Sequence, residues 1–373
     1  MTFPAWRWKE PMLKRKIVGG KIALLALLLI LLFTACAPAA LPANGTEDIP
    51  VYTFHTELQR AYLADKAGNV ARYAGGTAEL SRPEAVVLEL SDLSEEFAYL
   101  EVSEDPSFED SFTLLITQKK AEIYNCKIDT TYYYRAVKEG GETSDVSSFR
   151  TENVAPRNLY IDGVTNARDL GGYSTPFGKV RQGLLFRTAR LNKNKTVTPT
   201  PIISEEGIRT MKEFLKVRTE VDLRKNSDNE IGSLTASVLG DGVTYHNLPM
   251  TASSDMVTAN GESLKRLFSL LADENNYPLF FHCSIGTDRT GYTAFLILTL
   301  LGVDNAAIYR DYLFSNFGNI GSNRTTMNVM GFSLFLATQK GNNPREQAEY
   351  YLFSIGVTPK EISSFRRIMI EPR

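Results

Sequence analysis

The chain has 373 residues, which is long enough for two domains. Its composition is that of an ordinary globular protein, with 43% hydrophobic, 10% aromatic and 23% charged residues. The formal net charge of −2 at pH 7 argues against nucleic acid as a partner, because domains that bind polyanions usually carry a basic excess.

The N-terminus has the pattern of an export signal. Basic residues up to Lys21 precede a short apolar run over 22–33, and small residues follow it as far as Cys36. The run is shorter than the roughly 20 apolar residues that a transmembrane helix needs. We therefore predict a signal peptide over residues 1–35.

The residues around Cys36 resemble a bacterial lipoprotein box, with Phe33 at the position where leucine is usual. The resemblance implies that Cys36 carries a lipid and that the exported protein is anchored to the outer face of the bacterial cytoplasmic membrane. Residues 36–50 include several Ala, Pro, Asn and Gly residues, as expected of a flexible tether. An uncleaved anchor and plain secretion are the alternatives.

Short β-rich runs separated by turn residues follow the tether, at intervals typical of a sandwich. They lie at 85–90, 98–102, 111–116, 132–137 and 147–151. The segment 128–137, with three consecutive tyrosines, resembles the tyrosine corner of fibronectin type III domains. We predict a small all-β sandwich over 51–152 that positions the next domain. The alternative is that its aromatic run binds carbohydrate.

Strands and helices alternate from about residue 157 to the C-terminus, which predicts an α/β domain over 153–373. We expect a central sheet with helices on both faces. Strands are expected at 219–223, 243–248 and 280–283. Helices are expected at 205–215, 262–271, 292–301, 306–315, 324–338, 344–353 and 360–369.

The strongest chemical signal is a loop between an apolar strand and an apolar helix, from His282 to Gly291. Cys283 and Arg289 stand six residues apart within it. The start of a helix attracts anions through its free N–H groups and its dipole, and arginine fits two phosphate oxygens at once. Cys283 would then act as a thiolate nucleophile beneath a phosphate cradle. A merely structural buried cysteine would not explain the spacing.

Four segments resemble the bacterial tyrosine phosphatase family that includes the secreted mycobacterial and listerial enzymes. They are 166–172, 186–191, 221–224 and 282–291, and segment 312–316 also fits. The resemblance implies an α/β cysteine-phosphatase fold. The three histidines, His55, His246 and His282, are scattered singly, so we expect no metal, and we expect no cofactor. The resemblance also implies activity on phosphotyrosine, in some members also on phosphoserine, phosphothreonine or phosphoinositides. Thr287 replaces the family's usual lysine, which puts a preference for multiply phosphorylated substrates in doubt.

The predicted catalytic residues are Cys283, Arg289 and, as general acid, Asp288. Asp255 ranks second as general acid because many cysteine phosphatases place an aspartate about there on a mobile loop, and Asp222 ranks third. Asp222 could instead pair with Arg224 and brace the fold. The predicted substrate-binding residues are Ser284, Ile285, Gly286, Thr287 and Thr290, and the supporting residues are His282, Arg168 and Asp169.

Three other functions compete with a protein phosphatase. An inositol phosphate or phosphoinositide phosphatase would use the same loop with more basic residues around it. A binding module for phosphorylated ligands would normally lose Cys283 or Arg289, and a sulfurtransferase loop does not need Arg289-Thr290-Gly291. The expected partners are therefore a phosphorylated protein or phospholipid substrate and the membrane.

Overall fold

The computed structural model describes residues 49–65, 70–73, 81–194, 201–226, 231, 234–252, 256–318, 320 and 323–372. The chain divides into two units. The smaller unit includes 90–121 and 132–149, and the larger one includes 51–89, 122–131 and 150–373. The predicted signal peptide, most of the tether, Cys36 and Asp255 lie outside the described residues.

The smaller unit is built from antiparallel strands. β3 (Phe97–Ser103) pairs with β4 (Ser111–Leu115) on one side and with β6 (Thr131–Lys138) on the other. Leu100 and Val102 of β3 are buried, and the ring of Tyr132 stacks on that of Phe149 with their centroids 5.2 Å apart. The predicted β-rich region is therefore present.

The larger unit begins with elements that lie inside the predicted sandwich. They are β1 (Val51–Tyr52), α1 (Glu57–Ala64), the 3-10 turn η1 (Val70–Arg72), β2 (Val86–Glu89), part of β5 (Lys120–Ile123) and part of β7 (Ser147–Thr151). The expectation of strands and turns alone is wrong at α1. This helix starts at a capping box in which the side chains of Thr56 and Gln59 each accept a hydrogen bond from the other's backbone N–H.

Residues before the predicted boundary at 152 belong to the larger unit because they complete its core. The rings of Tyr62 and Phe317 lie 5.7 Å apart. Arg310 donates a 2.7 Å hydrogen bond to the carbonyl of Leu63, and the amide of Asn158 donates to the side chain of Gln59 at 3.1 Å. The larger unit thus extends beyond the expected domain 153–373.

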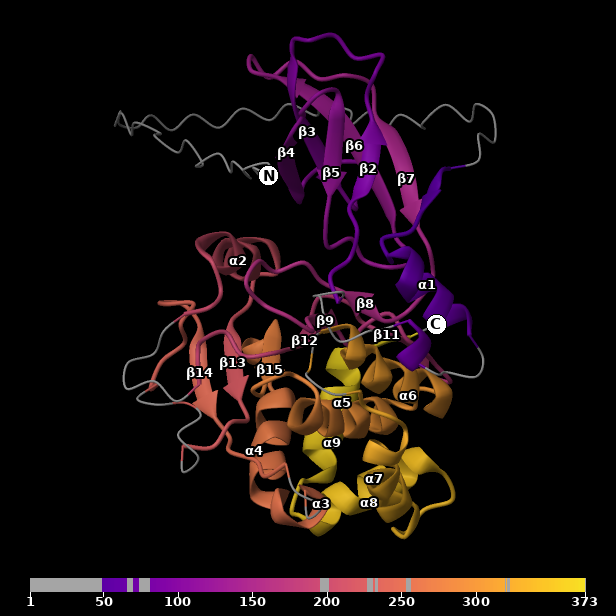
Figure 1. The fold of residues 1–373 in the computed structure, drawn as a ribbon, viewed down its shortest axis with the longest axis vertical. Coiled ribbons are helices and arrows are strands. Elements are labelled where there is room, and N and C mark those ends of the chain that lie inside the picture. The colour runs from indigo at the N-terminus through magenta and orange to yellow at the C-terminus, as the bar shows by residue number, and fades with distance from the viewer. Residues whose placement is uncertain are drawn as a thin grey trace, which may run out of the picture. The chain divides into compact units, whose positions relative to one another are not determined.

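The larger unit is organised around a six-stranded sheet with the order β14-β13-β15-β12-β9-β8 (Figure 1). The first four are parallel neighbours, and β9 and β8 continue the sheet antiparallel. Every residue of β13, β15 and β12 is buried, as expected where helices cover both faces. The bounds are Thr244–Asn247, Thr219–Asp222, Leu279–His282, Leu185–Thr188, Arg168–Asp169 and Arg157–Asn158, in sheet order.

Two separate cores confirm that helices lie on both faces of this sheet. Phe281 packs among residues of α4 (Gly261–Leu271), α5 (Asp288–Leu301), α6 (Asn305–Phe314), α7 (Met327–Ala337), α8 (Pro344–Ser354) and α9 (Pro359–Met369). Its neighbour Phe280 points to the opposite face and packs against α2 (Glu205–Arg209) and the π-helical turn η2 (Thr210–Phe214).

Shorter elements complete the larger unit. They are α3 (Met256–Ala259), the 3-10 turns η3 (Glu274–Asn276) and η4 (Ser315–Gly318), and a sheet of β10 (Ser174–Thr175), β11 (Gly178–Val180) and β16 (Ile370–Pro372). In the part of the chain that the structure describes, no helix is both long enough and apolar enough to cross a membrane.

Candidate active site

The cysteine loop lies where the sequence predicts it, at the carboxyl end of the parallel strands. β15 ends at His282, and α5 begins at Asp288. Cys283 is 2% exposed and Arg289 is 7% exposed. In open α/β sheets, ligands bind at this edge, in front of the strand ends. The loop therefore lies at the expected edge of the sheet.

Three consecutive carbonyl groups of the loop are held from outside by side chains. Arg190 donates to the carbonyl of Ser284 at 2.8 Å, and Asn166 donates to that of Ile285 at 3.0 Å. Arg187 donates to that of Gly286 at 2.7 Å. Because a trans peptide holds its C=O and N–H on opposite sides, the three following N–H groups turn away from these donors. They are directed to the inner side of the loop, next to the helix start, where an anion could bind.

Two glycines allow this loop to pack closely. Gly286 has φ +69°, and a Cβ atom there would lie 2.6 Å from the carbonyl oxygen of Thr188. A Cβ atom at Gly291 would lie 2.8 Å from the ring of Tyr312. Both distances are shorter than real contacts, so larger residues would displace the loop or the helix start.

A buried charge network lies behind the loop. The carboxylate of Asp311 accepts from Arg187 at 2.6 Å and from Arg168 at 3.1 Å, and all three side chains are almost completely inaccessible. Burial alone would raise the pKa of Asp311, but the two guanidinium groups lower it overall. Burial and Arg168 lower the pKa of Arg187 to about 10, so it stays charged at neutral pH.

This network positions side chains that hold the loop. Arg168 also donates to the side chain of Asn166, whose amide holds the carbonyl of Ile285. Arg168 thus acts behind the loop. Asp169 accepts from Arg157 at 2.6 Å and from the backbone N–H groups of Gly171 and Gly183. Asp169, predicted as a supporting residue, therefore stabilises a turn.

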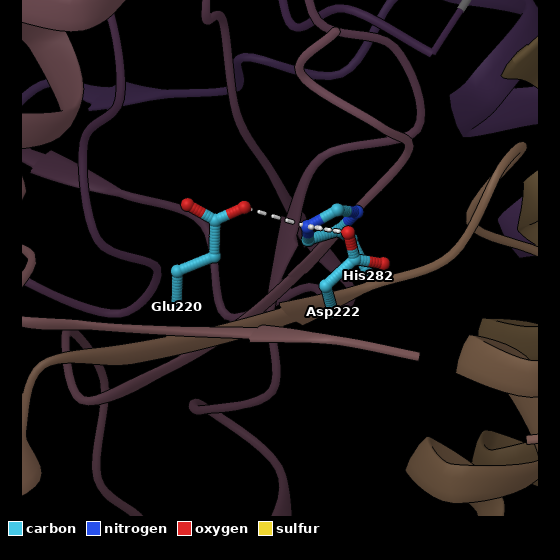
Figure 2. A group of neighbouring side chains, drawn as sticks. All are labelled: Glu220, Asp222 and His282. Carbon is cyan, nitrogen blue, oxygen red and sulfur yellow. Dashed lines mark hydrogen bonds and ion pairs between the residues drawn. The ribbon is translucent and has the colours of Figure 1, made fainter. Parts of the chain in front are cut away.

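His282 is oriented by two carboxylates of the adjacent strand, β13. Figure 2 shows its imidazole facing both of them. Its Nε2 atom lies 2.9 Å from Glu220 and 4.0 Å from Asp222, and its Nδ1 atom lies 3.4 Å from the carbonyl oxygen of Cys283. One donor atom from each of the three side chains lies within 4.8 Å of the others, a spacing that a metal ion would tolerate. The hydroxyl of Ser237 also bonds to Glu220.

Asp222 takes the bracing role that the sequence offered as the alternative to general acid. Both of its carboxylate oxygens bond to Arg224, at 2.6 to 3.1 Å, and the hydroxyl of Tyr245 donates to it at 3.1 Å. Burial raises the pKa of Asp222, but His282 and Arg224 lower it overall. Because Asp222 is completely buried and fully bonded, it is poorly placed to protonate a leaving group.

Asp288 is the partly exposed carboxylate at the start of α5. Arg324 donates to its two oxygens at 2.9 and 3.0 Å, and the Asp288 side chain is 30% exposed. The bond to Asp288 raises the pKa of Arg324. Sequence reasoning missed Arg324, since nothing in the sequence relates a residue 36 positions later to the loop.

The remaining loop side chains have different surroundings. The hydroxyl of Thr287 is buried, accepts from Asn166 at 3.3 Å and donates to the carbonyl of Ile285. The buried hydroxyl of Thr290 has no hydrogen-bond partner among the described residues. Arg289 donates weakly to the carbonyl of Leu223 and to the hydroxyl of Ser284, both at 3.4 Å.

Sequence reasoning also missed the roles of Arg187 and Asp311. A signal for Arg187 existed, because a charged residue inside a buried strand needs a partner. Its partner Asp311 lies in α6, between apolar residues that face the same core. The sequence does not say that these two positions meet.

A cysteine beneath inward-facing amides, with an arginine on the following helix turn, is the arrangement of enzymes that transfer a phosphoryl group to a thiolate. The sequence profile of the tyrosine phosphatase family matches residues 159–371, so the chain belongs to this family. It is an enzyme of that family, and its substrates are phosphorylated molecules.

Two relatives illustrate the similarity. A candidate tyrosine-protein phosphatase of Cupriavidus necator is 28% identical over 46% of this chain and 67% of its own length. The triple specificity protein phosphatase PtpB of Mycobacterium tuberculosis is 26% identical over 42% of this chain and 68% of its own length. The crystal structure of a cysteine-to-serine variant of P. aeruginosa TpbA in complex with phosphotyrosine aligns with 47% of this chain and 88% of its own, at 17% identity and a TM-score of 0.29.

Proposed function

We propose that this protein is a phosphatase that hydrolyses phosphotyrosine in proteins through a cysteinyl-phosphate intermediate. The observation that carries the proposal is the outward fixing of the carbonyls of Ser284, Ile285 and Gly286, beside Cys283. That fixing leaves a ring of N–H groups for the phosphoryl oxygens before substrate arrives, so little reorganisation is needed in the reaction.

The reaction has two steps. The Cys283 thiolate attacks phosphorus, the bond from phosphorus to the phenolic oxygen breaks, and Asp288 gives its proton to that oxygen. Water then attacks the phosphocysteine, Asp288 takes a proton from the water, and the sulfur leaves as thiolate. Arg289 stabilises the charge on the phosphoryl oxygens in both steps. The hydroxyl of Thr290 can donate to the leaving sulfur in the second step.

Two observations favour phosphotyrosine over other monoesters as the substrate. They are the membership of the tyrosine phosphatase family and the presence of Thr287 in the loop. Position 287 adds no positive charge beside the phosphate, so a second phosphate group on the substrate gains nothing there. The alternative is a dual-specificity protein phosphatase or a phosphoinositide or inositol phosphate phosphatase. The mycobacterial relative is known as a triple specificity protein phosphatase, which supports the broader range.

We also propose that the protein acts as a lipoprotein outside the cytoplasmic membrane. The support is the short apolar segment that ends at Cys36. The fibronectin type III-like sandwich would then hold the enzyme at a distance from the membrane. Replacing Cys36 by serine should stop labelling by a lipid precursor. Unchanged membrane association of a cleaved, unlabelled Cys36→Ser protein would refute the anchor.

Turnover of p-nitrophenyl phosphate tests the catalytic proposal. Cys283→Ser should abolish turnover yet keep binding of vanadate-like phosphate analogues, and EDTA should have no effect on the wild type. Cys126→Ser is the matched control, because Cys126 is also buried but lies outside the loop. Activity above about a tenth of wild type in Cys283→Ser would contradict covalent catalysis, since loss of a nucleophile costs several powers of ten.

A further inference from the structure

A cavity lies at the far end of α5 from the catalytic loop. Its volume is about 400 Å³, and its wall includes Leu301, the last residue of that helix. The helix has 14 residues, so its two ends are roughly 20 Å apart at 1.5 Å per residue. The cavity is large enough for a small ligand and is not part of the phosphate cradle.

The lining of the cavity combines apolar side chains with arginines. Phe177, Leu301, Ile370 and Pro372 supply the apolar wall. The other lining residues are Arg181, Arg345, Arg366 and Arg367. These residues come from the β10–β11 turn, the residue after β11, α5, α8, α9 and β16, so the fold gathers four positive charges from distant parts of the sequence.

Two of the four arginines lie close to carboxylates of the protein. Arg366 donates to Glu349 at 2.8 Å and to the carbonyl of Leu300 at the end of α5. Arg367 lies 3.6 Å from Glu274 in a mostly exposed pair, which adds little to stability.

Arg181 and Arg345 have no carboxylate at ion-pair distance among the residues that the structure describes. The guanidinium of Arg345 lies 4.9 Å from the centre of the half-exposed Phe177 ring. Its neighbour Glu346 turns both oxygens to Asn342 and Asn343 instead. Neither Arg181 nor Arg345 is therefore held in an ion pair among the described residues.

We propose that this cavity binds a small amphipathic anion, with a carboxylate or phosphate head on a hydrocarbon body. The head would pair with Arg181 and Arg345, and the body would cover Phe177, Leu301 and Ile370. A neutral apolar ligand would cover the arginines without compensating their lost hydration. A polyanion would leave the apolar lining unused. Both features are satisfied only by a ligand that has an acidic end and an apolar end.

Binding of dodecanoate and of dodecanol to the full-length protein, measured by calorimetry below their micellar concentrations, tests the proposal. Wild type should bind dodecanoate about tenfold more tightly than the neutral alcohol, because one charge-assisted contact is worth about that factor. The double variant Arg181→Ala/Arg345→Ala should bind dodecanoate at least about tenfold more weakly than wild type and bind dodecanol unchanged. Dodecyl phosphate, added with the catalytic loop saturated by vanadate, shows which head group is preferred.

Arg218→Ala is the matched control, since Arg218 is an exposed arginine of the larger unit outside the cavity. It should leave all affinities unchanged. The proposal is overturned if wild type binds no dodecanoate at millimolar concentration, if dodecanol binds equally well, or if Arg218→Ala weakens binding as much as the double variant does. A variant whose thermal unfolding midpoint equals that of wild type has an intact fold. Dodecanoate binding is measured without turnover. A negative binding result therefore overturns only the cavity proposal and leaves the phosphatase proposal untouched.

Discussion

Arg324 donates hydrogen bonds to both carboxylate oxygens of Asp288, at 2.9 and 3.0 Å. The pair joins the first residue of α5 to the segment that precedes α7. It holds the carboxylate at the edge of the phosphate cradle in one orientation. To deliver a proton, Asp288 must release at least one of these two bonds to the leaving group.

The first prediction separates the candidate general acids by the leaving group. Asp288→Asn should lower kcat for phenyl phosphate by about 10²–10⁴, because a phenolate of high basicity needs the proton. For p-nitrophenyl phosphate, whose leaving group is a weak base, the loss should be much smaller. Stopped-flow rates for a series of aryl phosphates measure how the rate depends on the basicity of the leaving group. Equal losses across the series in Asp288→Asn would pass the role to Asp255.

A second prediction concerns Arg324 as the residue that positions this acid. Arg324→Met should reproduce the leaving-group dependence of Asp288→Asn at smaller amplitude, because the acid remains but loses its orientation. Arg209→Met, which breaks a partly exposed pair with Glu206 away from the loop, is the control. If Arg324→Met lowers the rates of all aryl phosphates by the same factor, Arg324 binds substrate rather than positioning Asp288.

A third prediction concerns the buried carboxylate of Asp311. Asp311→Asn leaves the guanidiniums of Arg168 and Arg187 buried without their counter-ion, so the free energy of unfolding should fall by about 3–5 kcal/mol. Asp241→Asn, on an exposed loop, should change it by less than about 0.5 kcal/mol. Urea denaturation measures both. Equal stability of wild type and Asp311→Asn would show that the network is not coupled to folding.

The difference in unfolding free energy between wild type and Asp311→Asn has a defined pH dependence. The pKa of Asp311 is lower in the folded state, so its stabilising effect is complete above the unfolded carboxyl pKa of about 3.9. It is lost as the pH falls through the lower folded value. The stability difference between wild type and Asp311→Asn should therefore be constant near neutral pH and shrink only in acid. A difference that shrinks between pH 8 and 6 would point to another group.

A fourth prediction tests the close packing of Gly291. Gly291→Ala places a methyl group 2.8 Å from the ring of Tyr312, so it should cost about 1–3 kcal/mol of stability and reduce turnover. Adding Tyr312→Leu should recover part of the loss by removing the ring. Gly331→Ala is the control, because no atom lies within 4 Å of its added Cβ. Failure of the double variant to recover any stability would place the strain elsewhere.

A fifth prediction concerns the start of the catalytic body. A chain that begins at Glu152 loses α1, so Phe317 and Phe314 lose the buried ring of Tyr62. The amide N–H of Asn166 also loses its acceptor, the hydroxyl of Ser81. Compared with a chain that begins at Ile49, it should be several kcal/mol less stable or fail to fold. Equal stability of the two chains in thermal unfolding would restore the boundary expected from the sequence.

Much of the fold could be read from local patterns. The strands at Leu279–His282 and Thr219–Asp222 follow from short apolar or β-branched runs, and α4 follows from its amphipathic spacing. The loop from Cys283 to Thr287 was visible because strand, loop and helix are consecutive in the chain. The sequence analysis does not predict the helix α1, because its short amphipathic stretch adjoins the β-rich runs, although Thr56 and Gln59 carry a capping signal.

The sequence by itself determined the nucleophile, the phosphate-binding arginine and their loop, because all of these lie within ten residues of one another. Only the tertiary structure decided how that loop is held. Arg187, Asn166 and Arg190 lie about 100 positions before the carbonyls that they hold, and Arg324 lies 36 positions after Asp288. Such pairs are made by strand order and helix packing, which depend on long-range burial rather than on neighbouring residues.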